Sequence, residues 1–421
     1  MNRSVRIVAS ASVQAVVPGL RARFASVGIA LISVLVPLRA EVESASAPVR
    51  PTRGFRYQHE VVAEMPWSIH VVRIQRGHPE LRLETTLGRS NTLGMGLVSE
   101  QARATPSKAE LPIAAINGDF YTNEDDYPGR PRDLQIRRGE LLTDPDGHTC
   151  FWIDPSGSPR MTNVLSRFRV LWPDGSETPI GLNEPRSSSK AVLYTAAIGA
   201  STRTQGGIDF VLGPTADAAS PETMLRPGRR YSLALQRLVP RGNASLTPSN
   251  LVLSLGSRLT AKYRHLLPGS TLTVITETVP DLAGVETAIG GGPALVVDGQ
   301  AMRWSGLNLR HPRTAIGWND ETIFLVEVDG RQGDLSIGMS FPELAEYLQK
   351  LGCRQAMNLD GGGSATMWVL GNVINSPSEG RERPAANALV LTERRAPATR
   401  VLATSVQATS SAQAASSRPP S

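Results

Sequence analysis

The sequence predicts an α+β protein with mixed, strand-rich sheets, a few covering helices and an active site on turns at strand ends. Three observations support this fold class. Short apolar runs with the character of strands recur along most of the chain. One segment, residues 340–351, carries a complete set of helix start and stop signals. Glycine-rich turns with carboxylate side chains follow several apolar runs, where open sheets favour ligand sites.

The expected strands are of two kinds. Residues 70–74 and 81–85 alternate between apolar and polar side chains, as half-buried strands do. Residues 112–116 and 322–328 are compact apolar runs that end in polar turns, and residues 294–297 are followed by an Asp-Gly turn. These runs predict that sheets, rather than helices, form most of the core.

The helix expected at residues 340–351 is supported by its caps and its periodicity. Ser340 and Glu343 have the spacing of a capping box, with proline in the first turn. Leucines then recur at helical spacing, and Gly352 stands where a C-terminal cap glycine belongs. A strand is expected at 355–359, so the segment after it lies on a turn at a strand's carboxyl end.

The two ends of the chain are expected to lie outside the folded domain, which spans 55–394. Residues 1–47 have the order of a signal peptide and linker: arginines, an apolar run of about 15 residues, then small residues. We therefore expect an exported protein, periplasmic or secreted, with an uncleaved anchor as the alternative. Residues 395–421 contain no aromatic residue and predict a disordered tail. Within the domain, residues 168–280 are expected to form a subsidiary β region.

Composition and missing motifs exclude several classes of function. The net charge is +6, but many arginines lie near the termini, so no nucleic-acid partner is expected. The two cysteines, Cys150 and Cys353, form no CxxC pair, which argues against a thiolate zinc site. They are either one disulfide or two unrelated buried thiols. The sequence also lacks HExxH, GxSxG and GxxxxGK[ST], the signatures of zincins, nucleophile elbows and P-loops.

The sharpest chemical feature is the segment 358–366, Asn-Leu-Asp-Gly-Gly-Gly-Ser-Ala-Thr. Three consecutive glycines cost conformational entropy on folding, so we expect them where backbone approaches a ligand or takes positive φ. Successive N–H groups can cradle an anion, and the hydroxyls of Ser364 and Thr366 can add donors. Asp360 can then act as base, nucleophile or metal ligand. The alternative is a glycine-rich turn with a solvated aspartate.

Other turns at expected strand ends carry further cations and carboxylates, and one of them carries an aromatic side chain that could line a sugar pocket. Each of them, taken alone, is equally explained by an ordinary turn or a surface arginine. Together they suit an anionic substrate, because arginine is the preferred planar partner of phosphate oxygens. A second glycine run at 290–292 enters a strand and fits either a bulge or close approach of phosphate. The residues are Asn117, Asp119, Phe120, Arg313, Asp329 and Arg331.

Seven ordered pieces of the sequence, within about 110–392, resemble the phosphodiester glycosidase family. They are Ala-Ile-Asn-Gly-Asp-Phe-Tyr (115–121), Gly-Gly-Gly-Pro (290–293), Arg-Thr-Ala-Ile-Gly (313–317), Val-Asp-Gly-Arg (328–331), Gly-Met-Ser-Phe-Pro-Glu-Leu-Ala (338–345), the segment 358–366, and Glu-Arg-Pro-Ala-Ala-Asn-Ala (382–388). The resemblance implies a hydrolase that splits a sugar-1-phosphodiester into free sugar and a phosphate monoester.

The resemblance and the residues together yield a set of expected roles. Asp360 is the leading catalytic carboxylate, accompanied by Asp119 and Asp329. Arg313 and Arg331 are expected to bind phosphate. The other expected substrate-binding residues are Asn117, Phe120, Asn358, Gly361, Gly362, Gly363, Ser364, Thr366, Arg383 and Asn387.

The expected partner is a phosphorylated glycan, such as a cell-envelope or extracellular polysaccharide. No stable membrane insertion is expected if the signal is cleaved. No cofactor is implied with certainty, and a divalent cation near the carboxylates stays open. Two alternatives also stay open: a binding module for anionic glycans without turnover, and a phosphodiesterase that cleaves the P–O bond.

Overall fold

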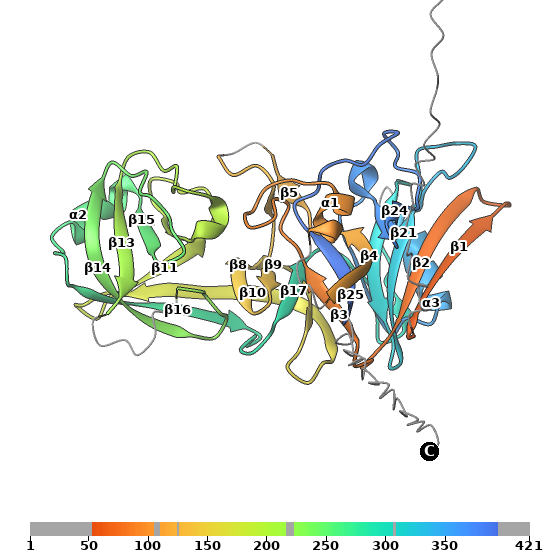
Figure 1. Cartoon of the computed structure of the whole chain (residues 1–421), viewed down its shortest axis with the longest axis horizontal. Helices are drawn as coiled ribbons and strands as arrows, with labels where there is room; N and C mark the ends of the chain where they lie inside the picture. The colour runs from red at the N-terminus through yellow and green to blue at the C-terminus, as the bar shows by residue number, and fades with distance from the viewer. Residues whose placement is uncertain (1–52, 105–109, 124–125, 216–222, 306–308, 395–421) are drawn as a thin grey trace, which may run out of the picture. The chain divides into compact units, whose positions relative to one another are not determined.

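Strands dominate the computed structural model, as the sequence predicts (Figure 1). The structure describes residues 53–104, 110–123, 126–215, 223–305 and 309–394. All its helices and strands belong to the second of two units into which the chain divides, Thr52–Ser421. The expected signal peptide, most of the linker and the expected tail lie outside the described residues.

Two antiparallel sheets form a sandwich. The larger has the strand order β1-β2-β21-β20-β22-β18-β19 and the smaller the order β24-β23-β4-β25-β3. The strands of the first are β1 (Phe55–Val62), β2 (Trp67–Gln75), β21 (Thr322–Val328), β20 (Arg313–Trp318), β22 (Gln355–Asn358), β18 (Ala294–Val297) and β19 (Gln300–Ala301). Those of the second are β24 (Asn372–Val373), β23 (Met367–Val369), β4 (Glu110–Asn117), β25 (Ala388–Arg394) and β3 (Leu81–Thr85).

The two sheets share one apolar core. Val72, Leu325 and Ile316 are register partners on neighbouring strands of the larger sheet, and all three are buried in this core. Ile116 and Leu389 are partners on the smaller sheet and pack into the same cluster. Burying each such side chain contributes about 1.5–3 kcal/mol. The expected strands at 70–74, 81–85, 112–116, 322–328 and 294–297 are thus confirmed, because alternate residues supply this core.

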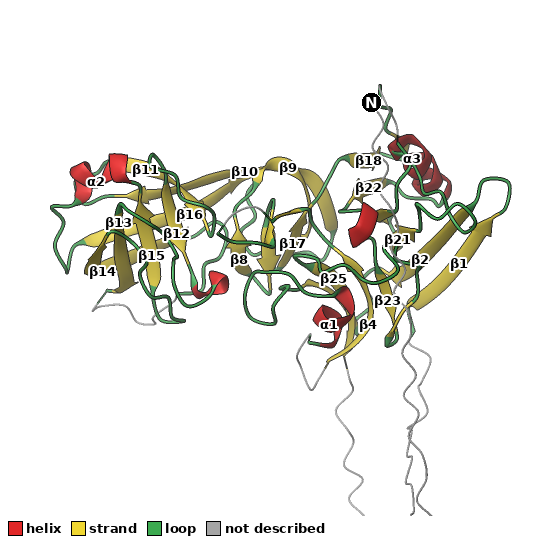
Figure 2. Cartoon of the chain, turned by 90° about the horizontal axis from the view of Figure 1, so that it is seen from above, coloured by secondary structure: helices red, strands yellow, loops and turns green. Residues whose placement is uncertain are grey.

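Two helices cover the outer faces of the sandwich. Helix α1 (Val98–Arg103) packs its buried residues on the smaller sheet, and α3 (Phe341–Lys350) packs on the larger. Figures 1 and 2 place them on opposite sides of the strands. In α3 the predicted capping box is present between Ser340 and Glu343, and Gly352 has φ +94° just after the helix. The helix prediction is therefore confirmed at both ends.

A third sheet curls into a barrel. Its order is β11-β12-β15-β13-β14-β16-β10-β9-β17-β7-β8, and β10 also pairs with β11, which closes the first seven strands. One pair, β11 with β12, is parallel, so the sheet is mixed. The strands are β7 (Gln135–Arg137), β8 (Glu140–Thr143), β9 (Asp146–Ile153), β10 (Pro159–Leu171), β11 (Glu177–Leu182), β12 (Ala191–Tyr194), β13 (Ile208–Pro214), β14 (Arg230–Pro240), β15 (Leu251–Leu255), β16 (Thr271–Val279) and β17 (Thr287–Gly290).

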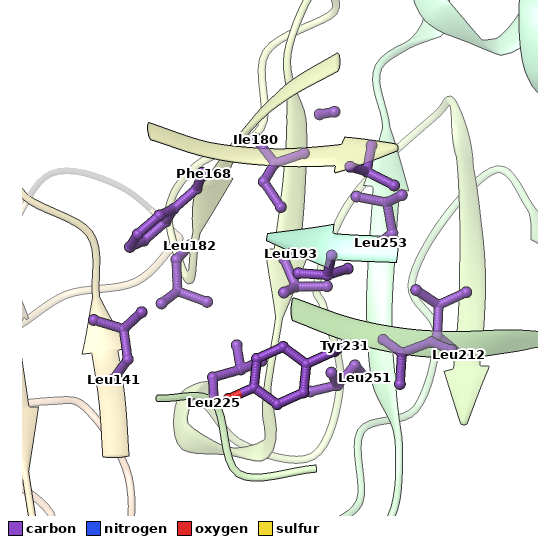
Figure 3. Close-up of a cluster of buried hydrophobic side chains, with 14 of the residues drawn as sticks. Leu141, Phe168, Ile180, Leu182, Leu193, Leu212, Leu225, Tyr231, Leu251 and Leu253 are labelled. Carbon is purple, nitrogen blue, oxygen red and sulfur yellow. The ribbon is translucent and has the colours of Figure 1, made fainter. Parts of the chain in front are cut away.

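The barrel has a core of its own, made by alternate residues of its strands. Figure 3 shows Leu193, Leu251, Leu253 and Tyr231 gathered between the strands. Helix α2 (Ser257–Tyr263) follows β15 and buries Tyr263 in the same core.

The barrel sheet continues to the sandwich through β9 and β17. Phe151 on β9 and Ile289 on β17 are buried in the sandwich core, so the end of β17 is fixed against the ends of the sandwich strands. Cys150 and Cys353 are both free and lie in different cores, which favours the alternative of two unrelated thiols. None of the described helices is long and apolar enough to cross a membrane.

Candidate active site

Asn117, the last residue of β4, ties together the turns that follow β4 and β22. Its side-chain amide donates to the backbone oxygen of Asp360 at 2.6 Å. Its side-chain oxygen accepts from the Thr314 hydroxyl at 2.7 Å and from the Thr366 N–H at 3.1 Å. Because the side chain is fully buried and makes these three hydrogen bonds, Asn117 holds the carboxylate-bearing turn in place.

Asn387, just before β25, makes a second set of hydrogen bonds that joins two turns. Its side-chain oxygen accepts from the Asp119 N–H at 2.9 Å, and its backbone oxygen accepts from the Gly118 N–H at 3.0 Å. A Cβ on Gly118 would collide with the Asn387 side-chain oxygen. Glycine is therefore required at 118 for close approach, and the two turns meet because of it.

The glycine turn after β22 is a short 3₁₀ helix, Gly362–Ser364. Gly362 has φ +59°, and a Cβ on Gly363 would overlap the side chains of Glu379 and Arg383. The N–H groups of Gly361, Gly362 and Ser364 donate within the turn or to neighbouring strands. These three N–H groups are therefore engaged within the protein, and the glycines also allow the side chains of Glu379 and Arg383 to approach. The expected anion cradle stays a prediction.

Asp360 lies half-buried at the start of this turn. Its Oδ1 accepts from the Gly361 N–H at 2.9 Å. Burial raises the pKa of Asp360, and Ser364, Arg383, the Gly361 N–H and Arg132 oppose that rise. Ser364 in turn accepts a hydrogen bond of 2.7 Å from the Arg383 guanidinium. Asp360, Ser364 and Arg383 thus form one connected group.

Asp119 is a second carboxylate beside this group, and it is 1% exposed. Its Oδ2 accepts from the Asp133 N–H at 2.8 Å, while its Oδ1 has no hydrogen-bond partner among the described residues. Burial raises the pKa of Asp119 to about 7. The backbone of Gly290 passes so close that a Cβ there would lie 2.6 Å from Oδ2, which accounts for the first glycine of that run.

Arg132 lies beside these carboxylates, although no sequence pattern predicted it there. It follows the hairpin of β5 (Tyr121–Thr122) and β6 (Arg130–Pro131). Its guanidinium stacks over the Phe120 ring with 4.4 Å to the centroid and donates to the Gly291 oxygen at 3.0 Å. Its charge lowers the pKa of both Asp119 and Asp360, so it lies near both carboxylates. No motif surrounds it in the sequence.

Buried polar atoms without a partner are concentrated here. Such atoms are rare in folded proteins and cost about 1–3 kcal/mol each, so a cluster of them indicates a place built to meet a polar ligand. Six of these atoms within the described residues belong to the turns just described: Asp119 Oδ1, Arg132 Nε, Asn358 Oδ1, Thr366 Oγ1, Arg383 Nε and Asn387 Nδ2. The Asn358 amide itself donates to the Gly292 oxygen at 3.0 Å, which joins the second glycine run to the site.

The structure does not bring Arg313 into this group. Its guanidinium donates to the backbone oxygens of Met339 at 2.8 Å and Leu309 at 3.0 Å and stacks on Phe341, 4.1 Å from the centroid. Burial, followed by the charge of Arg331, lowers the pKa of Arg313 to about 10. Arg313 is thus engaged in holding the start of α3.

Arg331 and Asp329 lie in two further environments, different from each other and from that of Arg313. Arg331 is exposed, with its guanidinium 3.3 Å from His311 and close to the outer side of Gly362. Asp329 is buried and accepts from Ser68 at 2.8 Å and from the Ser376 N–H at 2.7 Å. Asp329 therefore belongs to a separate polar cluster inside the sandwich.

Comparison with known proteins gives two sequence relatives. A prophage-derived uncharacterised protein of Bacillus subtilis, YomE, is 39% identical over 93 residues, which are 22% of this chain and 14% of that protein. The mouse N-acetylglucosamine-1-phosphodiester alpha-N-acetylglucosaminidase is 29% identical over 126 residues, 27% of this chain and 24% of the mouse protein. The matched segments thus span less than a quarter of each relative.

Two solved structures share the fold. A hypothetical protein from Synechocystis has a TM-score of 0.64 at 19% identity, covering 81% of this chain and 62% of that one. A protein from Burkholderia pseudomallei K96243, named as a suspected exported protein, has a TM-score of 0.60 at 24% identity, covering 77% and 74%. At these identities the likeness concerns the fold alone.

The family comparison concerns the C-terminal part of the domain. A model of the phosphodiester glycosidase family matches residues 240–392. This range contains Asn358, Asp360, Arg383 and Asn387, whereas Asn117, Asp119 and Arg132 precede it. The resemblance of the sequence to the phosphodiester glycosidase family is therefore confirmed, over residues 240–392 of the chain.

Proposed function

We propose that this protein hydrolyses the bond between the anomeric carbon of a sugar and the oxygen of a phosphodiester. Water supplies the new hydroxyl on the anomeric carbon, and the bridging oxygen leaves with the phosphate monoester. The observation that carries the proposal is that two cations, Arg132 and Arg383, lie close enough to two buried or half-buried carboxylates, Asp119 and Asp360, to oppose the rise in their pKa that burial causes. The family match at 240–392 supports the same reaction class.

The two arginines are suited to the phosphate. A guanidinium presents planar donors that match phosphate oxygens, and Arg132 and Arg383 each keep a buried Nε without a partner. A phosphate monoester is already a stable leaving group, so most of the catalytic effect is expected from charge stabilisation around it. Phe120 lies under Arg132 and supplies an apolar surface beside that position.

The two carboxylates differ in their surroundings and therefore in their proposed roles. Asp360 lies next to Ser364 and Arg383, so we assign it to the anomeric carbon, as base or nucleophile. Asp119 has a pKa of about 7 and a free oxygen, which suits a group that exchanges a proton near neutral pH. The substrate we propose is a phosphodiester-linked glycan outside the cell, because the N-terminus has the residue order of an export signal.

Product analysis on a panel of sugar-1-phosphodiesters tests the proposal. In heavy-oxygen water we expect free sugar with the label on its anomeric hydroxyl and an unlabelled phosphate monoester. Label in the phosphate, together with sugar phosphate, would show P–O cleavage and overturn the assignment. Binding without any product would favour a glycan-binding module instead.

The Asp360→Asn variant tests the leading carboxylate. Removing its charge while keeping its shape is expected to lower kcat by about 10²–10⁴-fold, the range that general acid–base groups contribute. The matched control is Asp334→Asn, because Asp334 is an exposed aspartate. Full turnover by a folded Asp360→Asn protein would show that another group does the chemistry.

A further inference from the structure

A line of polar side chains crosses the inside of the larger sheet, where apolar residues otherwise pack. His70, Glu327 and Thr314 are buried register partners on β2, β21 and β20, while His59, the partner of His70 on the edge strand β1, is exposed. The next equivalent positions along these strands, such as Val72 and Leu325, belong to the sandwich core. A sandwich interior accepts such a line only where its polar groups are satisfied.

Four side-chain atoms that could coordinate a metal ion lie close together on or just after these strands. His70 Nε2 lies 3.2 Å from Asp329 Oδ2, and the Ser68 hydroxyl lies 2.8 Å from the same carboxylate oxygen and 3.4 Å from His70 Nε2. One carboxylate oxygen of Glu327 lies within 4.8 Å of both the His70 and Asp329 donors. All four residues are buried.

Glu327 is the member that hydrogen bonding leaves unexplained. It is 0% exposed, and neither carboxylate oxygen has a hydrogen-bond partner among the described residues. The Asn375 amide lies nearby, but it donates to Asp329 at 3.4 Å and to the Ala365 oxygen at 3.2 Å. Two acidic side chains thus share a low-dielectric interior, where a charge without a partner costs several kcal/mol.

No lysine or arginine within the described ranges forms an ion pair with Glu327 or Asp329. Within the part of the chain that the structure describes, the one ion-pair partner is His70, which lies against Asp329. A divalent cation would neutralise both carboxylates and use the otherwise unpartnered oxygens of Glu327. This charge argument and the convergence of donors point to the same occupant.

We propose that Ser68, His70, Glu327 and Asp329 bind a divalent transition-metal cation such as Zn²⁺ or Mn²⁺. One imidazole and two carboxylates are a donor set that these ions accept. Two ligands with bonds of roughly 2.1 Å at right angles are separated by about 3.0 Å. The atoms of Ser68, His70 and Asp329 are 2.8–3.4 Å apart, and a Glu327 oxygen lies within 4.8 Å of the His70 and Asp329 atoms. The Tyr57 hydroxyl lies 2.8 Å from His70 Nδ1 and orients the ring, as partners of metal-bound histidines do.

The proposed cation supports the site turns without touching the substrate. Asp329 Oδ1 accepts from the Ser376 N–H at 2.7 Å, and Asn375 binds the Ala365 oxygen and the Met367 N–H. These residues begin the loop that leads to Arg383 and Asn387. A cation at Asp329 would therefore hold the base of that loop, which is a structural role distinct from the proposed hydrolysis.

The test uses the full chain without added histidines. The protein is stripped with a chelator, supplied with Zn²⁺, Mn²⁺, Mg²⁺ or Ca²⁺, and analysed for bound metal by mass spectrometry and for Tm. We expect one tightly held ion per chain and a higher Tm with Zn²⁺ or Mn²⁺. Binding of none of these ions by the folded wild-type protein would overturn the proposal.

The Glu327→Gln variant separates a metal ligand from a neutral buried acid, because glutamine imitates the protonated carboxyl. A metal ligand predicts that affinity falls by at least about 10- to 100-fold, the loss that changes in the residues around the ligands already cause, and that the metal-dependent rise in Tm is lost. The control, Glu346→Gln on the exposed face of α3, should keep both. Unchanged metal affinity in Glu327→Gln would contradict the site.

A poorly folded Glu327→Gln variant would leave the wild-type protein as the test. Loading it with Co²⁺ should produce visible absorption bands of a nitrogen–oxygen site, and Zn²⁺ should displace them. Their absence at full cobalt loading would place the ion elsewhere and overturn the assignment.

Discussion

At the scale of single residues, arginines with the same chemistry have different uses. Arg313 stands in a motif of the family resemblance, yet its guanidinium is engaged with the Met339 and Leu309 oxygens and the Phe341 ring. Arg132 stands in no motif, yet its charge opposes the rise in the pKa of Asp119 and of Asp360. An arginine's role depends on which groups surround its guanidinium, and those groups come from distant segments.

Alanine substitutions should separate these two arginines. Arg313→Ala is expected to lower the free energy of unfolding by about 2–4 kcal/mol, since two charged hydrogen bonds and a cation–π contact are lost. Arg132→Ala should instead lower kcat/KM by about 10- to 100-fold, the value of a charge-assisted hydrogen bond, with a smaller change in stability. Urea unfolding and kinetics on both proteins are the measurements. The reverse pattern would restore Arg313 as the phosphate ligand and remove Arg132.

At the scale of elements, the site depends on how closely the ends of β4 and β25 approach each other. Gly118 and Asn387 are the point of contact, and Asn387 also fixes the Asp119 N–H. The hydrogen bonds of Asn117 and Asn387 connect turns from three separate stretches of the chain. A small displacement at this contact should therefore move both carboxylates.

The Gly118→Ala variant tests this dependence. Its Cβ would overlap the Asn387 side chain and lie 2.6 Å from the Ile289 Cδ1, so we expect a loss of about 1–3 kcal/mol in stability, typical of overpacking, together with loss of activity. Gly333→Ala is the control, because a Cβ there meets nothing within 4 Å. Equal stability and activity of the two variants would show that the contact is dispensable.

At the scale of the whole molecule, a sandwich and a barrel each have their own apolar core, and β9 and β17 connect them. Asp119 is enclosed between these parts, since Asp133 and Gly290 belong to the segments that flank β7 and β17. The ionisation of Asp119 is therefore linked to the free energy of unfolding of the protein.

Stability should fall with rising pH because of Asp119. Its folded pKa of about 7 lies above the usual 3.8, so between these values the folded state keeps a proton that the unfolded state releases. Its contribution is complete below the usual pKa and is lost as the pH rises through about 7, by at most about 4 kcal/mol. Asp119→Asn should remove this decline, measured by urea unfolding between about pH 5 and pH 8. Parallel pH profiles of the two proteins would contradict the raised pKa.

Much of the fold could be predicted from local patterns. The strands at 81–85 and 322–328 and the helix after Ser340 match the structure because apolar periodicity and capping act over a few residues. The carboxylates on the turns after β4 and β22 could also be predicted, because each stands just after a predicted strand in the sequence. The hydrogen bond from the Gly362 N–H to Pro312 could not be predicted, because Pro312 lies on a segment that the local pattern does not contain.

The sequence by itself determined a strand-rich domain, its one well-capped helix, the carboxylates on strand-end turns and the resemblance to a phosphodiester glycosidase. Only the tertiary structure decided which side chains share a site. It placed Arg132 with Asp119 and Asp360, engaged Arg313 at the start of α3, and gathered Asp329 with His70 and Glu327 inside the sandwich. The physical reason is that hydrogen bonds, burial and charge act through space, between residues that here lie more than two hundred positions apart in the chain.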